Sequence, residues 1–138
     1  MSWSTVWAAV SAISTALTAL IALLAIYRWR KQDELKAKLE FKKAVSVYAW
    51  RLTQLPELLE QHLIVQAYAR EVQALHDALS ACHNAWLVSE GLMEVNKEVT
   101  TSWKYIFENN NLYIGGKMHS SELGIRAMNI LHEKFVFR

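Results

Sequence analysis

The residues of this chain that could perform chemistry are few, and histidine is the first type to consider. Two of the five histidines, His76 and His83, are seven positions apart, and the single cysteine, Cys82, precedes the second. Residues seven apart share a helix face but are separated by two turns, which is too far for two ligands of one zinc ion. We therefore predict no metal site and expect solvated or half-buried histidines. One cysteine also excludes a disulfide within the chain.

Two arginine–histidine pairs have a spacing that could matter for catalysis. Arg70 is followed by His76, and Arg126 by His132, with five residues between the members of each pair. This spacing resembles the R-x(4-6)-H motif of HEPN-domain ribonucleases, small all-helical proteins in which such residues from paired domains meet. The resemblance would imply RNA cleavage at a site shared by two protomers. Residues six apart on one helix point about 120° apart, so they would not converge within one chain.

No other catalytic motif is recognisable. The sequence contains no glycine-rich phosphate loop, HExxH, CxxC or GxSxG pattern, and Gly115-Gly116 is expected to form a turn. We accordingly predict a non-enzymatic protein with no catalytic residue and no cofactor. From Arg28 to Arg51 there are eight basic and three acidic residues, and from Leu52 onward seven basic and ten acidic ones. Because the basic residues are not spread over a recognition face, no specific nucleic-acid partner is predicted.

The elements that would position these residues begin with an apolar segment. Residues 3–27 are 25 positions without a charge. A helix of that length would be about 37 Å long, which exceeds the roughly 30 Å of a bilayer's hydrocarbon core. Tryptophans near its start, and Tyr27 and Trp29 at its end, are typical interfacial anchors. A cleaved signal peptide is the alternative, but such a peptide carries its positive charge before a shorter apolar run.

Basic residues follow this segment and none precedes it, so the positive-inside rule places the N-terminus outside and the remainder in the cytoplasm. We predict a single-pass protein of the inner (plasma) membrane, with a transmembrane helix over residues 1–30 and a cytoplasmic domain over 31–138. The adjoining basic residues are expected to set topology and to attract acidic lipid. They are Arg28, Arg30, Lys31, Lys36 and Lys38. Alternatively, they would line the mouth of an assembled pore and favour anions.

Two lines of residues within the segment recur at alternating intervals of three and four. We call the first the small face; it consists of Ser4, Ala8, Ser11, Thr15, Thr18, Ala22 and Ala25. We call the second the bulky line; it consists of Trp3, Val6, Val10, Ile13, Leu17, Leu20, Leu24 and Tyr27. At 3.5 residues per turn the two lie on nearly opposite sides of a helix.

In a bilayer, small residues let helices approach closely, and hydroxyls can bond between helices. The small face therefore predicts self-association, or packing against another helix, with the left-handed crossing typical of heptads. The alternative is that these residues are merely common in spanning helices, with hydroxyls bonded to their own backbone.

After the span, the pattern predicts an all-α bundle of about four helices whose first helix continues from the span. That helix is expected to end at Thr53, with an apolar stripe of Leu35, Leu39, Val45, Tyr48 and Leu52. A second helix is expected from Pro56 to about Val88, with the stripe Tyr68, Val72, Leu75, Leu79, Cys82 and Trp86. Its first turn would hold two glutamates, which favour a helix N-terminus.

Serine caps are expected for the last two helices. Ser89 would cap a third helix to about Glu108, with Leu92, Val95, Val99, Trp103 and Ile106 buried. Asn109–Asn111 would end it, and residues 112–116 would form a short connection, briefly extended. Ser120 or Ser121 would cap the last helix, through about Lys134. Two phenylalanines, Phe135 and Phe137, are expected to dock onto the bundle, the alternative being a neighbouring molecule.

This layout resembles that of several small bacterial membrane proteins, among them accessory or effector proteins of phage-defence systems that assemble into membrane pores. We predict a protein that self-associates in the bilayer as a homo-oligomer and acts as a pore-forming or membrane-depolarising effector. One alternative is a membrane-tethered adaptor whose bundle recruits a cytoplasmic protein partner. The HEPN-like ribonuclease is the third.

Overall fold

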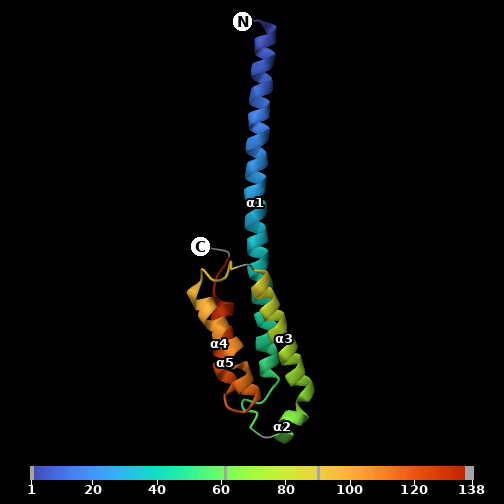
Figure 1. Cartoon of the computed structure of the whole chain (residues 1–138), viewed down its shortest axis with the longest axis vertical. Helices are drawn as coiled ribbons and strands as arrows, with labels where there is room; N and C mark the ends of the chain where they lie inside the picture. Colours follow the sequence, from blue (N-terminus) through green and yellow to red (C-terminus); the bar gives the residue numbers. More distant parts are fainter. Residues whose placement is uncertain (1, 61, 90, 136–138) are drawn as a thin grey trace. The chain divides into compact units, whose positions relative to one another are not determined.

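The computed structural model describes residues 2–60, 62–89 and 91–135, and in these ranges it contains helices, turns and connections but no strand (Figure 1). The five helices are α1 (Trp3–Thr53), α2 (His62–Ala67), α3 (Ala69–Val88), α4 (Lys97–Ile114) and α5 (Ser120–His132). The predicted all-α fold, with one long apolar N-terminal helix, is confirmed. The chain divides into two compact units, Met1–Glu34 and Leu35–Arg138.

The first unit is the N-terminal part of α1. The amide N–H groups of Thr5 and Val6 both donate to the carbonyl oxygen of Ser2, which starts the helix. From Ser2 to Asp33 every residue is exposed. Among the described residues, α1 is the one helix long and apolar enough to cross a membrane. The unit therefore has no hydrophobic core of its own.

The second unit is a helical bundle with one core. Its centre is aromatic: the ring centroids of Phe41 and Trp86 are 5.3 Å apart, and those of Phe41 and Trp103 are 5.5 Å apart, edge to face. These contacts join α1, α3 and α4, while α5 contributes Leu123, Ala127 and Ile130, all fully buried. Aromatic pairs at such separations contribute about 0.5–1.5 kcal/mol beyond the burial of their area.

Part of the apolar stripe expected on α1 is confirmed. Val45, Tyr48 and Leu52 are buried, but Leu39 is 45% exposed. Phe41, which was not included in the stripe, is fully buried. The intervals from Phe41 through Val45 and Tyr48 to Leu52 are four, three and four, so Phe41 continues the heptad line from which Leu39 departs.

The start of the second helix was predicted wrongly. Residues 56–60 are not helical, and the next helix, α2, begins at His62. The carbonyl oxygen of Pro56 accepts the Tyr113 hydroxyl at 2.6 Å, and that of Glu57 accepts the Ser120 amide at 2.9 Å. These carbonyls therefore bond to α4 and α5 instead of to a following helical turn. A further break at Tyr68 separates α2 from α3.

Ser89 does not begin the third helix. Its amide donates to the carbonyl of Ala85 and its hydroxyl to that of Trp86, so it ends α3. The N-cap of α4 is Asn96, whose side-chain oxygen accepts the amides of Glu98 and Val99. Val95 lies before the helix and is 89% exposed, contrary to the expectation that it is buried. The Ser89 side chain could cap either end of a helix, and the prediction placed it at the start of α4, whereas it bonds at the end of α3.

The asparagines at 109–111 do not stop α4, which runs through them to Ile114. Asn110 is fully buried and accepts a hydrogen bond of 2.7 Å from the Tyr48 hydroxyl.

The end of α4 is instead the expected turn at Gly115-Gly116. Gly116 has φ +73°, and a Cβ there would lie 2.5 Å from the Leu59 carbonyl oxygen. Both the left-handed conformation and this close approach require glycine.

The last helix differs slightly from its prediction. The N-cap of α5 is His119, with Ser120 as the first helical residue, and the helix ends at His132. Phe135 then packs against the core, and the Lys42 ammonium lies 5.7 Å from the centre of its ring. Docking of Phe135 is thus confirmed, whereas Phe137 lies outside the described residues.

The Tyr48–Asn110 hydrogen bond gives a testable prediction. Tyr48→Phe removes the donor and leaves the buried Asn110 oxygen unpaired, which should lower the free energy of unfolding by about 1–3 kcal/mol. Tyr48→Phe with Asn110→Leu removes both polar partners and should recover a large part of that loss. Thermal unfolding of the full chain in mild detergent, followed by near-ultraviolet circular dichroism, measures both. A double variant whose loss of stability equals the sum of the losses in Tyr48→Phe and Asn110→Leu would show that the two side chains are not coupled.

Candidate functional site

The small face of the first unit is the first candidate site. All seven of its residues are exposed in the single chain. The Thr15 hydroxyl donates to the Ser11 carbonyl at 2.9 Å, and the Thr18 hydroxyl to the Ser14 carbonyl at 2.8 Å. Each of these hydroxyls therefore donates its hydrogen within its own helix. This agrees with the alternative given above, in which the hydroxyls of the span bond to their own backbone. Its oxygen can still accept a bond from a neighbouring helix.

The opposite side of the same unit is uncovered and much bulkier. Ile13 is 69% exposed, Leu17 57% and Leu24 56%. Removing one such side chain from water stabilises a protein by about 1.5–3 kcal/mol. A soluble monomer rarely leaves so large an apolar patch in water, so this run of side chains favours apolar surroundings.

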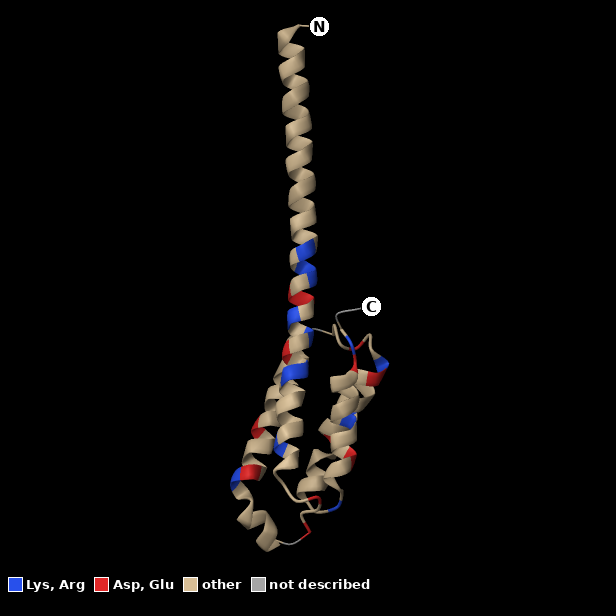
Figure 2. Ribbon diagram, turned by 180° about the vertical axis from the view of Figure 1, so that it is seen from behind, with Lys and Arg blue, Asp and Glu red and all other residues tan. Residues whose placement is uncertain are grey.

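In Figure 2 the uniformly tan part of α1 is followed by a part in which blue basic positions alternate with tan and red ones, and the basic residues predicted beside the span belong to α1. Arg28, Arg30, Lys31 and Lys36 are exposed, whereas Lys38 is half-buried. The four exposed side chains are therefore accessible to an acidic lipid surface or to water. Lys38 belongs to a pocket of the bundle.

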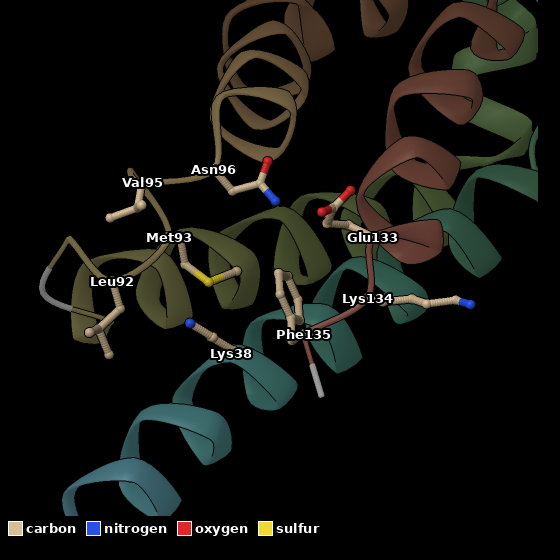
Figure 3. Close-up of a pocket in the computed structure, with 8 residues that line it drawn as sticks. All are labelled: Lys38, Leu92, Met93, Val95, Asn96, Glu133, Lys134 and Phe135. Atoms are coloured by element: carbon tan, nitrogen blue, oxygen red, sulfur yellow. The ribbon is translucent and has the colours of Figure 1, made fainter. Parts of the chain in front are cut away.

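That pocket lies between α1, the segment before α4 and the segment after α5. The pocket is lined by Lys38, Leu92, Met93 and Phe135, among others. Figure 3 shows that the Lys38 amine is directed toward the segment that carries Leu92, whereas the Lys134 side chain points away. Its volume is about 150 Å³, below the roughly 300 Å³ at which ligand pockets begin. Lys42 secures one wall by donating to the Glu133 carbonyl at 3.0 Å. This pocket joins the chain's C-terminal segment to the bundle and is too small for a substrate.

The two arginine–histidine pairs lie on different helices, Arg70 and His76 on α3, Arg126 and His132 on α5. Both members of the first pair are exposed. In the second pair, the Arg126 guanidinium lies 4.7 Å from the centre of the Tyr105 ring, and the Tyr105 hydroxyl donates to Glu122 at 2.9 Å. Arg126 thus belongs to a cluster that fastens α5 to α4.

A second hollow lies between α3 and α4, and sequence reasoning did not find it. Its volume is about 560 Å³, and it opens widely to the surface beside Leu87, Glu94 and Lys104. His83 stacks on Phe107 there, with centroids 4.7 Å apart and planes at 17°. The His83 Nδ1 atom is buried and has no hydrogen-bond partner among the described residues. The sequence offered one indication of this hollow, the apolar residue Leu87, which follows Trp86 at the end of the apolar stripe expected on the second helix.

The sulfur and histidine residues do not assemble into a metal centre within the described part of the chain, where no group of three possible ligands is found. Cys82 is fully buried beneath α1, and burial raises the pKa of its thiol to about 12. Reactive thiols are exposed and have a lowered pKa. Cys82 is thus a core residue and not a nucleophile.

Cys82 should therefore report on folding. At pH 8 the native thiol should react with a maleimide on the order of a hundred-fold more slowly than a surface cysteine, because it is both covered and protonated. The matched control is Ser80→Cys in a Cys82→Ser background, since Ser80 is exposed on the same helix. Mass spectrometry of the labelled full chain measures both rates. Equal rates would show that the core opens readily.

The same thiol predicts a pH dependence. Its pKa is raised from 9.0 to about 12 in the folded chain, so the unfolded chain loses the proton first. The contribution of Cys82 to stability is thus fully present below pH 9 and declines as the pH rises toward 12. Cys82→Ser should flatten this decline in alkaline unfolding curves recorded by circular dichroism. An unchanged slope would contradict the assignment.

Comparison with known proteins yields no relative: no protein-family profile matches the chain, and no curated protein or solved structure is significantly similar to it.

Proposed function

We propose that this chain is a single-pass membrane protein that self-associates through the small face of its N-terminal helix and acts on the membrane as a pore-forming or depolarising effector. The N-terminus lies outside and the bundle in the cytoplasm, with the basic residues from Arg28 onward at the inner surface. The proposal assigns no catalytic residue and no cofactor.

One observation carries the proposal: a helix with complete exposure from Ser2 to Asp33 has two unlike faces. The bulky side suits lipid, since side chains such as Leu17 and Leu24 are more than half exposed. A helix that only anchors a domain needs no small face on the opposite side. Small residues let two helices approach closely in a bilayer, where dispersion contacts drive association.

Hydroxyls on the small face support a further step, to a water-filled pore. Ser11, Thr15 and Thr18 lie on one side of the helix, and the two threonines already donate to their own backbone. Their oxygens would then present acceptors to water in a ring of helices. The basic residues that follow would make the inner mouth positive and favour anions.

A membrane-tethered adaptor is the second candidate, and the hollow between α3 and α4 favours it. Leu87 is 59% exposed and Phe107 45%, next to the polar residues Glu94 and Lys104. An apolar centre with a charged rim is typical of protein-binding surfaces. In that case the span would only hold the bundle at the membrane.

Enlarging the small face tests the leading proposal. Ala8→Leu with Thr15→Leu should abolish oligomers of the full chain in mild detergent and ion flux across liposomes, because the added side chains keep the helix backbones apart. The matched control adds bulk to the bulky line instead: Val6→Leu with Val10→Leu should leave both properties unchanged. Native mass measurement and a dye-release or ion-flux assay give the readouts. A monomeric wild-type chain would contradict the proposal.

Exchange of the span separates the effector from the adaptor. An unrelated polyleucine helix in place of residues 3–27 should eliminate ion flux if the span acts, while binding of a cytoplasmic partner would persist if the span only tethers. Leu87→Glu tests the hollow directly, since it should weaken partner capture without changing flux. Flux retained by the polyleucine chimera would contradict the effector proposal.

A further inference from the structure

The bulky line of the first unit is followed on the same side of the helix by positive charge. Its last two members, Leu24 and Tyr27, are 56% and 59% exposed. Arg28 follows Leu24 by four positions, Lys31 follows Tyr27 by four, and both basic residues are exposed. Residues four apart lie one above the other on a helix. Two cations therefore adjoin the apolar line directly beyond its end, and all four residues belong to the first unit.

The Lys31 side chain is directed back toward this apolar line. Its ammonium lies 5.0 Å from the centre of the Tyr27 ring, in the direction that helical side chains take, toward the helix N-terminus. A hydrogen bond with the Tyr27 side chain is the main reason that the pKa of Lys31 is raised, whereas Glu34 contributes least to the shift. Tyr27 thus holds a charged ammonium beside the end of the bulky line.

Arg28 and Lys31 are placed to bind one anion together. Residues three apart on a helix have Cβ atoms about 5–6 Å apart. Arginine offers a fork of donors that matches a phosphate group, and lysine adds a mobile point charge. Arg30 does not join them, because it is two positions from Arg28 and one from Lys31, and residues at those spacings do not face each other. The pair is therefore distinct from the general excess of basic residues after the span.

The position of the pair on the helix indicates which anion it would bind. In a bilayer, side chains such as Leu24 contact acyl chains, and tyrosine side chains lie at the level of the headgroups. A lipid bound through its phosphate would therefore contact the cations with its headgroup and Leu24 with its acyl chain, whereas a free anion has nothing to contact Leu24. A headgroup that carries a cation of its own would be repelled by two positive charges. Lipids with a net negative headgroup fit best.

We propose that Arg28, Lys31 and Tyr27 form a site for the phosphate group of one anionic lipid on the bulky side of the span. The inference deepens the proposed function and rests on it for the location of the helix in a bilayer. It assigns two of the basic residues to lipid and leaves Arg30 and the basic residues after it available to the mouth of a pore. Because the site lies on the bulky side, a bound lipid does not compete with helices that associate through the small face.

Lipid binding by the full chain in mild detergent tests the site. Native mass spectra recorded during titration should show that phosphatidylglycerol binds on the order of ten-fold more tightly than phosphatidylcholine. Arg28→Gln and Lys31→Gln should each weaken phosphatidylglycerol binding about five-fold or more. The matched control, Arg30→Gln, removes the same charge from the same segment and should have little effect. Equal losses in all three variants would indicate attraction by net charge alone and would overturn the site.

Tyr27→Leu tests the positioning of Lys31 without changing any charge. Loss of the ring releases the ammonium, so phosphatidylglycerol should bind several-fold more weakly although every basic residue is kept. The matched control is Trp29→Leu, which removes another aromatic side chain, 75% exposed, at a position that does not face Tyr27. Slow maleimide labelling of Cys82 shows that the bundle of each variant is folded. A Tyr27→Leu chain that binds phosphatidylglycerol as tightly as wild type would contradict the inference.

Two further measurements identify the source of the phosphate and separate this inference from the proposed function. Glycerol phosphate, which has no acyl chain, should not displace phosphatidylglycerol from the wild-type chain, and equal competition would overturn the assignment to lipid. Native mass and ion flux are recorded on the same preparations. A wild-type chain that oligomerises and conducts but does not prefer phosphatidylglycerol overturns this inference alone. Lipid preference in a monomeric, non-conducting chain supports the site and contradicts the proposed function. A chain that does not insert into vesicles overturns both.

Discussion

Apolar side chains on α1 have to be removed from water, and every other feature of the chain follows from how this is done. In the second unit, Phe41, Val45, Tyr48 and Leu52 are covered by side chains of α3, α4 and α5. In the first unit, the protein covers none of the corresponding residues from Ser2 to Asp33. At about 25 cal/mol for each Å² of apolar surface, this exposure would be costly in water, which supports the proposal that a bilayer surrounds the segment.

Polar contacts determine where the helices of the bundle end. The Tyr48 hydroxyl of α1 donates to Asn110 of α4, and the Tyr113 hydroxyl of α4 donates to the Pro56 carbonyl, so α4 is held to α1 and to the segment that follows it. Burial raises the pKa of both phenols, so they remain protonated donors at any physiological pH. This hydrogen bond compensates for the burial of the Asn110 side-chain oxygen inside α4, whereas the amide nitrogen of the same side chain has no partner among the described residues.

Periodicity allowed the existence of the helices and most of their buried sides to be predicted, whereas their ends could not be. Val45 and Leu75 could be assigned to the core because an apolar heptad line persists over several turns. Ser89 and Asn96 both have side chains that cap helices, and the sequence alone does not tell that Ser89 bonds back to Trp86 at the end of α3 while Asn96 begins α4. Likewise, Asn109–Asn111 are poor helix formers locally, but the tertiary bond from Tyr48 overrides that preference.

The candidate functional sites also differ in how far the sequence could predict them. The small face could be predicted because a seven-residue pattern is visible without coordinates. The hollow between α3 and α4 could not, since it depends on how His83 stacks on Phe107, and those residues are 24 positions apart. Sequence spacing predicts contacts along one helix, whereas contacts between helices depend on rotation and separation that no local pattern contains.

The hydroxyl groups of the span limit what can hold two copies together. Thr15 and Thr18 donate to carbonyls of their own helix, so hydrogen bonds between helices would have to come from other donors. In the proposed assembly, close packing of alanine and serine would then be the main attraction between spans, and such packing is weak for each residue.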